Sequence, residues 1–244
     1  MNADLRPHHT RNANVEAKSK GWRLEIPAGD KRGYRLAQLD DYYHFPRRNF
    51  PHHSLTLGLR ARTSAGSLPG TWGFGVWNDP FGLSLGFGGS PLRLPALPNA
   101  AWFFCASKEN YLSFGEKPGN GFLAQTFRSP RFDARLVPAG LAMPFSRRTT
   151  RRLLERIVEE DGVCLVVDVT QWHGYRLRWS PKRVVFEVDE DVVMETSVSP
   201  YPPLGLVIWI DNQYAAFPPE GGPAFGILPN PAAWLEIEEL EFND

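Results

Sequence analysis

The sequence of 244 residues has two cysteines, Cys105 and Cys164, and lacks any run of the roughly 18 apolar residues that a membrane-spanning helix needs. Neither cysteine belongs to a CxxC or Cys/His motif, and both are flanked by apolar residues. We therefore expect two buried cysteines, with their pairing left open, and neither a metal site nor a cofactor. The polar N-terminus lacks the apolar core of a secretory signal, which favours a cytoplasmic protein.

An excess of charge of one sign is also missing. The chain has 27 basic and 27 acidic residues, and no Lys or Arg follows Arg183. A neutral chain with an acidic C-terminal part argues against a nucleic-acid partner. Arginines are concentrated between residues 128 and 156. This basic stretch fits either a solvated helix surface or contact with an anionic membrane.

Glycine, proline and aromatic residues are abundant, and they separate many short apolar segments. In the segment 54–63, Leu55, Leu57 and Leu59 alternate with polar residues, which is the period of a half-buried strand. Similar segments are WRLEI (22–26), TWGFGVW (71–77), FGLSLGF (81–87), AAWFFCAS (100–107), VCLVVDV (163–169), HGYRLRW (173–179), LGLVIWI (204–210) and WLEIEELEF (234–242). They predict an all-β sandwich over residues 21–244, preceded by a flexible arm at 1–20.

One stretch has a helical rather than a strand period. Within residues 146–162 the apolar positions at helical spacing are Leu153, Leu154, Ile157 and Val158. Ser146 is a suitable N-cap and Gly162 a suitable C-terminal stop. With the apolar segment before it, this stretch predicts an insertion at 136–162 that contains one helix. Its apolar and basic residues suggest a membrane-surface contact through 136–156.

The segment from Trp172 to Val193 resembles the concanavalin A-like lectin/glucanase superfamily, glycoside hydrolase family 16 in particular. That family has a strand of the type H-x-Y-x-x-x-W-[ST]-P that leads into F-x-V-D-G. The matching residues here are His173, Tyr175, Trp179, Ser180, Pro181, Phe186, Val188 and Asp189, with Glu190 at the position of the turn glycine. The resemblance implies a concanavalin A-like jelly-roll β-sandwich whose concave face holds the site, and the helical insertion expected at 136–162 is an addition to that fold.

The family's catalytic strand has the pattern E-x-D-x-(x)-E, with alternate carboxylates that point into the cleft. The corresponding segment here, residues 100–107, contains no carboxylate. The resemblance therefore implies the scaffold but argues against the standard hydrolysis. Aromatic residues take the place of the acids. They fit either a strand buried on both faces or a cleft that holds a carbohydrate or an apolar small molecule.

Two strand ends supply polar candidates, WNDPFG (77–82) and IDNQY (210–214), and either could instead reflect ordinary turn chemistry. If they converge at one rim, the expected ligand-binding residues are Trp77, Asn78, Trp102, Phe104, Trp209, Asp211, Asn212 and Gln213. The candidate catalytic residues are Asp79, Asp211 and His173. A lone histidine on an apolar face is more often a hydrogen-bonded core residue than a catalyst.

Three hypotheses about function follow. The first is a ligand-binding or catalytic module that uses the concave face without the standard acid pair. The second is an enzyme with unconventional residues, either a glycosidase that uses Asp79 and Asp211 or a cyclase or isomerase of an apolar substrate. The third is a membrane-associated interaction protein that works through the insertion. The expected partner in the first two is a small-molecule or carbohydrate ligand.

Overall fold

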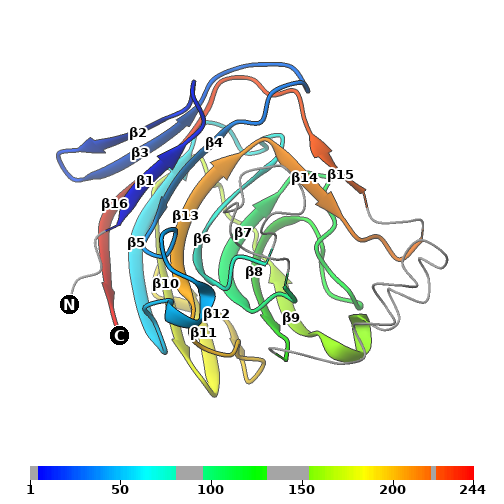
Figure 1. The fold of residues 1–244 in the computed structure, drawn as a ribbon. Coiled ribbons are helices and arrows are strands. Elements are labelled where there is room, and N and C mark those ends of the chain that lie inside the picture. The colour runs from blue at the N-terminus through cyan, green and yellow to red at the C-terminus, as the bar shows by residue number, and fades with distance from the viewer. Residues whose placement is uncertain (1–4, 81–95, 131–153, 221–223) are drawn as a thin grey trace.

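Two seven-stranded antiparallel sheets pack face to face in the computed structural model, which describes residues 5–80, 96–130, 154–220 and 224–244 (Figure 1). The first sheet contains, in spatial order, β1 (Arg6–His9), β4 (Leu36–Asp40), β13 (Gly205–Asp211), β6 (Thr71–Trp77), β7 (Ala100–Ala106), β8 (Gly121–Arg128) and β9 (Glu159–Cys164). The second contains β12 (Asp191–Thr196), β11 (Arg183–Val188), β10 (His173–Ser180), β5 (Leu55–Thr63), β16 (Ala233–Asn243), β3 (Gly21–Ile26) and β2 (Asn14–Lys18). Smaller elements are η1 (Arg47–Asn49) and the pair β14 (Gln213–Ala216) and β15 (Ala224–Ile227).

The core between the sheets follows from the two-residue period of the strands. Leu57 of β5 pairs with Leu177 of β10, and both side chains are buried between the sheets. Alternate residues on β5 face the outside and are only partly buried. The expected all-β sandwich is therefore confirmed, and period-two alternation is its cause.

Strand β7 is buried on both of its faces. Ala101 and Phe103 belong to the core between the two sheets. Trp102 and Phe104 point to the opposite side and join a second apolar cluster on the concave face of the first sheet. Because this second cluster buries the other face of the strand, apolar residues occur at every position of the segment. The aromatic residues thus serve a buried strand and a cleft at the same time.

The expectation of a flexible arm at 1–20 is wrong. β1 pairs with β4 at the edge of the first sheet, and β2 pairs with β3 at the edge of the second. Both strands are largely exposed and polar. An edge strand is held by main-chain hydrogen bonds on one side and needs no continuous apolar face, so hydrophobic periodicity does not reveal it.

The expected helix ends earlier than Gly162. Residues 154–157 are helical, whereas Glu159–Cys164 form β9, in which Gly162 pairs with Gln125 of β8. Arg128 donates from Nε to Glu159 across the same pair of strands at 3.0 Å, so the acidic residues belong to a sheet edge rather than to a helix end. The predicted strand at 81–87 and most of the insertion, including the proposed membrane contact, lie outside the described residues.

The two cysteines are both free. Cys105 is partly buried against the core, where burial raises its pKa to about 12. Cys164 is exposed at the end of the edge strand β9, so the expectation that both are buried is wrong for Cys164. No helix among the described residues combines the length and the hydropathy that crossing a membrane requires.

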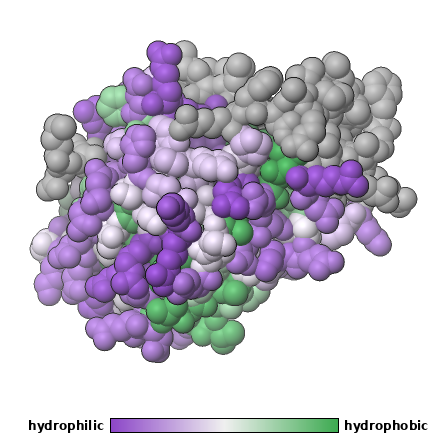
Figure 2. Space-filling view, turned by 90° about the horizontal axis from the view of Figure 1, so that it is seen from below, coloured by the Kyte–Doolittle hydropathy of each residue, from purple (hydrophilic) through white to green (hydrophobic). Residues whose placement is uncertain are grey.

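The outer surface is mostly hydrophilic on the face that Figure 2 shows, with smaller apolar areas. Among the described residues, the large apolar side chains that remain exposed are few and scattered: Phe45, Val166, Val192 and Tyr201. Most aromatic side chains lie instead in the core between the sheets or in the cluster on the concave face.

Candidate functional site

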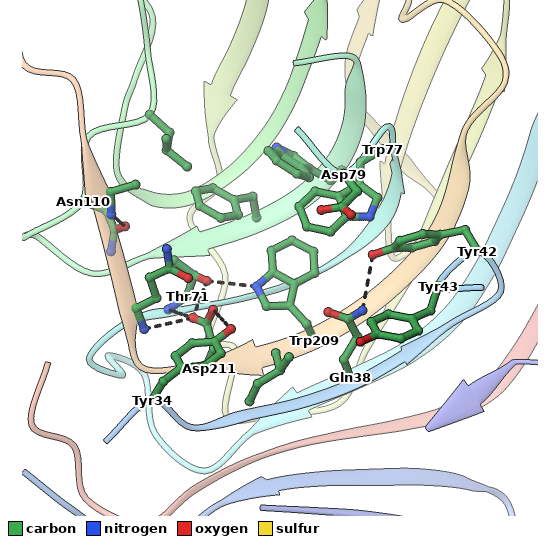
Figure 3. A pocket seen from close by; sticks show the side chains of 16 residues that line it. Tyr34, Gln38, Tyr42, Tyr43, Thr71, Trp77, Asp79, Asn110, Trp209 and Asp211 are labelled. Carbon is green, nitrogen blue, oxygen red and sulfur yellow. Dashed lines mark hydrogen bonds between the residues drawn. The ribbon is translucent and has the colours of Figure 1, made fainter. Parts of the chain in front are cut away.

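A pocket opens on the concave face of the first sheet, over β4, β6, β7 and β13 (Figure 3). The empty space within it is about 730 Å³, including the open mouth. Its described lining consists of Tyr34, Leu36, Gln38, Tyr42, Tyr43, Thr71, Trp77, Asp79, Trp102, Phe104, Asn110, Leu112, Trp209, Asp211, Gln213 and Ala215. Mostly apolar walls with a few polar groups are typical of small-molecule sites.

Three indole rings, from Trp77, Trp102 and Trp209, form what we call the tryptophan platform. The rings of Trp77 and Trp209 are nearly parallel, 4° apart, with centroids separated by 6.0 Å. Trp102 lies 5.9 Å from Trp77 and 5.7 Å from Trp209, and Phe104 stacks on Trp102 at 5.2 Å. Three neighbouring strands thus contribute to one joined aromatic surface.

The platform depends on residues that hold its rings in place. A Cβ atom on Gly73 would come within 2.9 Å of Cη2 of Trp209, so the glycine leaves room for that indole. Trp102 donates from Nε1 to the buried Gln125 at 3.3 Å, and Gln125 donates in turn to the carbonyl of Leu112 at 2.7 Å. The rings are therefore fixed by their surroundings before a ligand arrives.

Asp211 lies at one end of the pocket and is 7% exposed. Its Oδ1 accepts hydrogen bonds from the hydroxyl of Thr71 at 2.8 Å and from the main-chain N–H groups of Thr71 and Gln213 at 3.2 and 3.3 Å. Its Oδ2 accepts one, from the hydroxyl of Tyr34 at 3.2 Å. Thr71 also accepts from Nε1 of Trp209 at 2.9 Å, which links the carboxyl group to the platform.

Burial raises the pKa of Asp211 to about 7, although hydrogen bonds from Thr71, Gln213 and Tyr34 oppose the shift. All of these partners are neutral, so no cation offsets the loss of hydration. Burial also raises the pKa of Tyr34, and the negative charges of Asp211 and Asp79 add to that effect. A carboxyl group that titrates near neutral pH inside a pocket is typical of functional sites.

A polar group lies on the other side of Trp209. Gln38 of β4 donates from Nε2 to Asp40 at 3.0 Å and to the hydroxyl of Tyr42 at 3.3 Å. Figure 3 shows Gln38 and Tyr42 on this side of the pocket, with the Trp209 ring between Gln38 and the Tyr34–Asp211 pair. Amide and hydroxyl groups therefore border the aromatic surface at more than one point.

The two predicted strand ends leave the sheet in opposite directions. β6 and β13 are antiparallel neighbours, with Trp77 opposite Gly205 and Thr71 opposite Asp211. Asp79 follows β6 and Asp211 ends β13, so they start from opposite ends of this strand pair. Both still line the pocket, and Figure 3 shows the Trp209 ring between them.

The structure brings most of the predicted site residues together in the pocket: Trp77, Asp79, Trp102, Phe104, Trp209, Asp211 and Gln213. Asn78 and Asn212 are not among the residues lining it. The amide of Asn78 donates to the carbonyl of Leu97 at 2.8 Å. Asn212, which is fully buried, donates to the carbonyls of Gly33 and Leu228 at 3.1 and 2.9 Å. Both asparagines hold loops in place.

His173 lies in β10, in the second sheet, and not in this pocket. Its Nδ1 is 2.6 Å from Oδ2 of Asp189, in the turn after β11. Residues 5–80, 96–130, 154–220 and 224–244 contain no group of three or more His, Cys, Asp and Glu side chains placed to bind a metal ion. The chemistry of the pocket therefore belongs to its aromatic rings, amides, hydroxyls and two carboxyl groups.

Five lining residues from β4 and its flanks are not among those that the sequence predicts: Tyr34, Leu36, Gln38, Tyr42 and Tyr43. The segment does carry a signal. Leu36, Gln38 and Asp40 alternate with Ala37 and Leu39, which belong to the core between the sheets. A glutamine at a buried strand position, on the face opposite the core, indicates a second buried surface.

No protein-family model matches the sequence, and no curated protein matches it. Among solved structures, LamAcat from Zobellia galactanivorans is similar, with 14% identity and a TM-score of 0.52 over 95% of this chain and 80% of that chain. The legume lectin-like domain from Entamoeba histolytica has 11% identity and a TM-score of 0.47, over 98% and 89%. The carbohydrate binding module CBM66 from Bacillus subtilis has 10% identity and a TM-score of 0.42, over 98% and 95%.

The match to LamAcat extends over nearly the whole chain and shows a shared fold. Together with the two antiparallel sheets and their strand order, it defines the fold. That fold is a concanavalin A-like jelly-roll β-sandwich. Because a fold of this kind serves many functions, the function has to be argued from the pocket itself.

Proposed function

We propose that the concave pocket binds a carbohydrate. The observation that supports this most directly is the tryptophan platform, bordered by the carboxyl of Asp211 and the amide of Gln38. The C–H face of a sugar ring packs on an indole, and its hydroxyl groups both donate and accept hydrogen bonds. An apolar ligand would form no hydrogen bonds with these polar groups.

The proposal includes the loss of the standard acid pair. Strand β7 lies centrally in the first sheet, between β6 and β8, and its residues 100–106 contain no carboxylate. The two acids of the pocket come from opposite ends of β6 and β13 and flank Trp209. Retaining hydrolysis needs two carboxyl groups about 5–5.5 Å apart on either side of the scissile bond. Binding without cleavage therefore fits the arrangement best.

The test is a titration of the full chain with neutral and charged oligosaccharides, read by tryptophan fluorescence and calorimetry. We expect Trp77→Ala to weaken binding of the best ligand at least tenfold, because it removes part of the platform. Trp234→Ala is the matched control: Trp234 is also half-buried, but it lies in β16 of the second sheet under Arg23. Equal affinity of the two variants would contradict a site on the concave face.

Catalysis is the second candidate, and the pKa of Asp211 near 7 is the observation that favours it. A carboxyl group that titrates there can donate or accept a proton at neutral pH. The same titrations separate the two functions if the oligosaccharide is recovered and its length is measured. Intact chains support binding alone, whereas shortened chains that disappear with Asp211→Asn support a glycosidase.

A further inference from the structure

The pocket combines many aromatic faces with acids and, among its described lining residues, contains no Lys, Arg or His. The aromatic residues include Trp77, Trp102, Trp209 and Tyr34, and the acids are Asp79 and Asp211. The negative faces of aromatic rings attract cations, most strongly when the cation is removed from water. The carboxylate of Asp211 adds to the same negative potential.

The basic residues near the pocket do not contact Asp211. Arg47 donates to the main-chain oxygens of Asn78 and Asp79 at 2.7 and 2.5 Å. Arg35 donates to the main-chain oxygens of Asp30 and Gly33 at 3.0 and 2.7 Å, and to the side chain of Asn230.

The nearest histidine contributes little positive charge. His8 stacks on Tyr43 at 4.0 Å, and its Nε2 lies 3.4 Å from Asp40. Burial, with help from the neighbouring His44, lowers the pKa of His8 despite the nearby Asp40. Its ring is therefore largely neutral at pH 7. The charge of Asp211 is left without a counter-ion from the described part of the chain.

We propose that the carbohydrate recognised here carries an ammonium group, as an amino sugar does, and that Asp211 is its counter-ion. This inference rests on the proposed function and specifies its ligand class. The sugar ring packs on the tryptophan platform, while its ammonium group reaches Oδ2 of Asp211. Oδ2 has room for such a contact because it accepts one hydrogen bond, from Tyr34, whereas Oδ1 accepts three.

Binding of a cation then has to be linked to the protonation of Asp211. A bound ammonium group favours the carboxylate, so below neutral pH binding releases the proton that Asp211 carries in the empty pocket. Affinity for a permanently charged ligand should fall by up to tenfold per pH unit below the pKa of Asp211. It should level off above that pKa.

The experiment compares chitosan oligomers, which carry free amino groups, with chitin oligomers of equal length, which are N-acetylated and neutral. Benzyltrimethylammonium is the third probe, because its charge does not titrate. We expect the aminated oligomer to bind at least tenfold more tightly than the neutral one near pH 7. In Asp211→Asn this preference and the pH dependence of benzyltrimethylammonium binding should disappear, whereas Asp191→Asn, at an exposed site, should keep both.

The outcomes separate this inference from the proposed function. Equal binding of aminated and neutral oligomers by the native chain overturns the inference and leaves carbohydrate binding in place. Binding of benzyltrimethylammonium with the expected pH profile, but of no oligosaccharide, keeps the cation site and overturns the carbohydrate. Absence of all binding overturns both. Because the pH profile is measured on the native chain, the test remains decisive if Asp211→Asn does not fold.

Discussion

At the scale of single residues, Asp211 illustrates how a carboxyl group is kept in a buried pocket without a basic partner. Three donors converge on Oδ1, including two main-chain N–H groups that the turn after β13 and the start of β6 provide. These bonds favour the ionised form, but burial outweighs them and raises the pKa to about 7. The result is a group whose charge depends on pH in the neutral range and on what occupies the pocket.

The raised pKa predicts how Asp211 affects stability. The native state holds the proton of the Asp211 carboxyl more tightly than the unfolded chain does. The resulting contribution to stability is fully present below the ordinary pKa of 3.8 and is lost as pH rises toward about 7. Asp211→Asn keeps the shape, and its amide can donate to the hydroxyl oxygen of Tyr34. As pH rises from 4 to 8, we expect the unfolding free energy of the variant to increase by up to about 4 kcal/mol relative to that of the native chain.

Urea unfolding of both proteins at the two pH values checks this prediction. Asp191→Asn, which changes an exposed aspartate, serves as the control and should track the native chain. If Asp211→Asn shifts the unfolding free energy by the same amount at both pH values, the carboxyl group does not titrate differently in the native state.

At the scale of elements, the pairing of β6 with β7 and β13 explains why the site has its shape. β6 places Trp72 and Phe74 in the core between the sheets and leaves glycines on the concave side at 73 and 75. The large side chains of the two neighbouring strands, Trp102 and Trp209, spread over these glycines. Small residues on the central strand therefore leave room for the indole rings of the strands on both sides of it.

This arrangement predicts different effects for alanine at two glycines. A Cβ on Gly73 would lie 2.3 Å from the carbonyl oxygen of Phe103 and 2.9 Å from Trp209. Gly58 of β5 has nothing within 4 Å of its Cβ position. We expect Gly73→Ala to cost about 1–3 kcal/mol through overpacking, and Gly58→Ala to be neutral or to stabilise by up to about 1 kcal/mol.

Chemical denaturation of the two variants measures these free energies, and ligand titration reports on the platform. Gly73→Ala should also weaken ligand binding, because Trp209 has to move, while Gly58→Ala should leave it unchanged. If Gly73→Ala were more stable than Gly58→Ala, the concave surface would accommodate the added Cβ atom without a loss of stability.

The elements also differ in how far the sequence predicts them. Strong alternation, as in residues 54–63, predicts β5 because one face is buried and the other is not. β1 and β2 went unpredicted because main-chain pairing alone holds a polar edge strand. The helical spacing of Leu154, Ile157 and Val158 predicts a helix that continues into β9, and only pairing with β8 makes the acidic residues after them a strand.

At the scale of the whole molecule, His52 connects the two sheets. Its Nε2 is 2.6 Å from Asp41, which follows β4 in the first sheet, and its Nδ1 is 2.5 Å from Asp244, which follows β16 in the second. Burial by itself would lower the pKa of His52, but hydrogen bonds and charges from both aspartates outweigh it and raise the pKa. A protonated His52 therefore holds the ends of two strands from different sheets.

This connection predicts a loss of stability as the solution becomes alkaline. The native pKa of His52 is raised above its ordinary 6.5. Its contribution to stability is therefore fully present below pH 6.5 and is lost as pH rises through the native pKa. Asp244→Asn removes one of the two carboxylates while Asp41 remains. Because the Asp244 side chain is largely exposed, we expect the variant to lower the pKa of His52 and to reduce stability by up to about 1 kcal/mol near pH 6, with little effect at pH 9.

Titration of the His52 ring by NMR measures the pKa, and urea unfolding measures the stability. An unchanged pKa in Asp244→Asn would mean that Asp41 alone holds the charge. Asp191→Asn again provides an exposed aspartate for comparison.

Alternation of apolar and polar residues is enough to predict the all-β sandwich, because the strands of its core bury one face. The same pattern predicts that strand 100–106 has apolar residues on both faces. Seven of the sixteen described residues that line the pocket could also be predicted, because aromatic and polar side chains occur together on its strands and at their ends. Which of these residues come together depends on how distant strands pair. The antiparallel pairing of β6 with β13 places Asp79 and Asp211 on either side of Trp209, and packing without a basic partner gives Asp211 its pKa near 7. Both properties depend on neighbours distant in sequence, which local patterns do not encode.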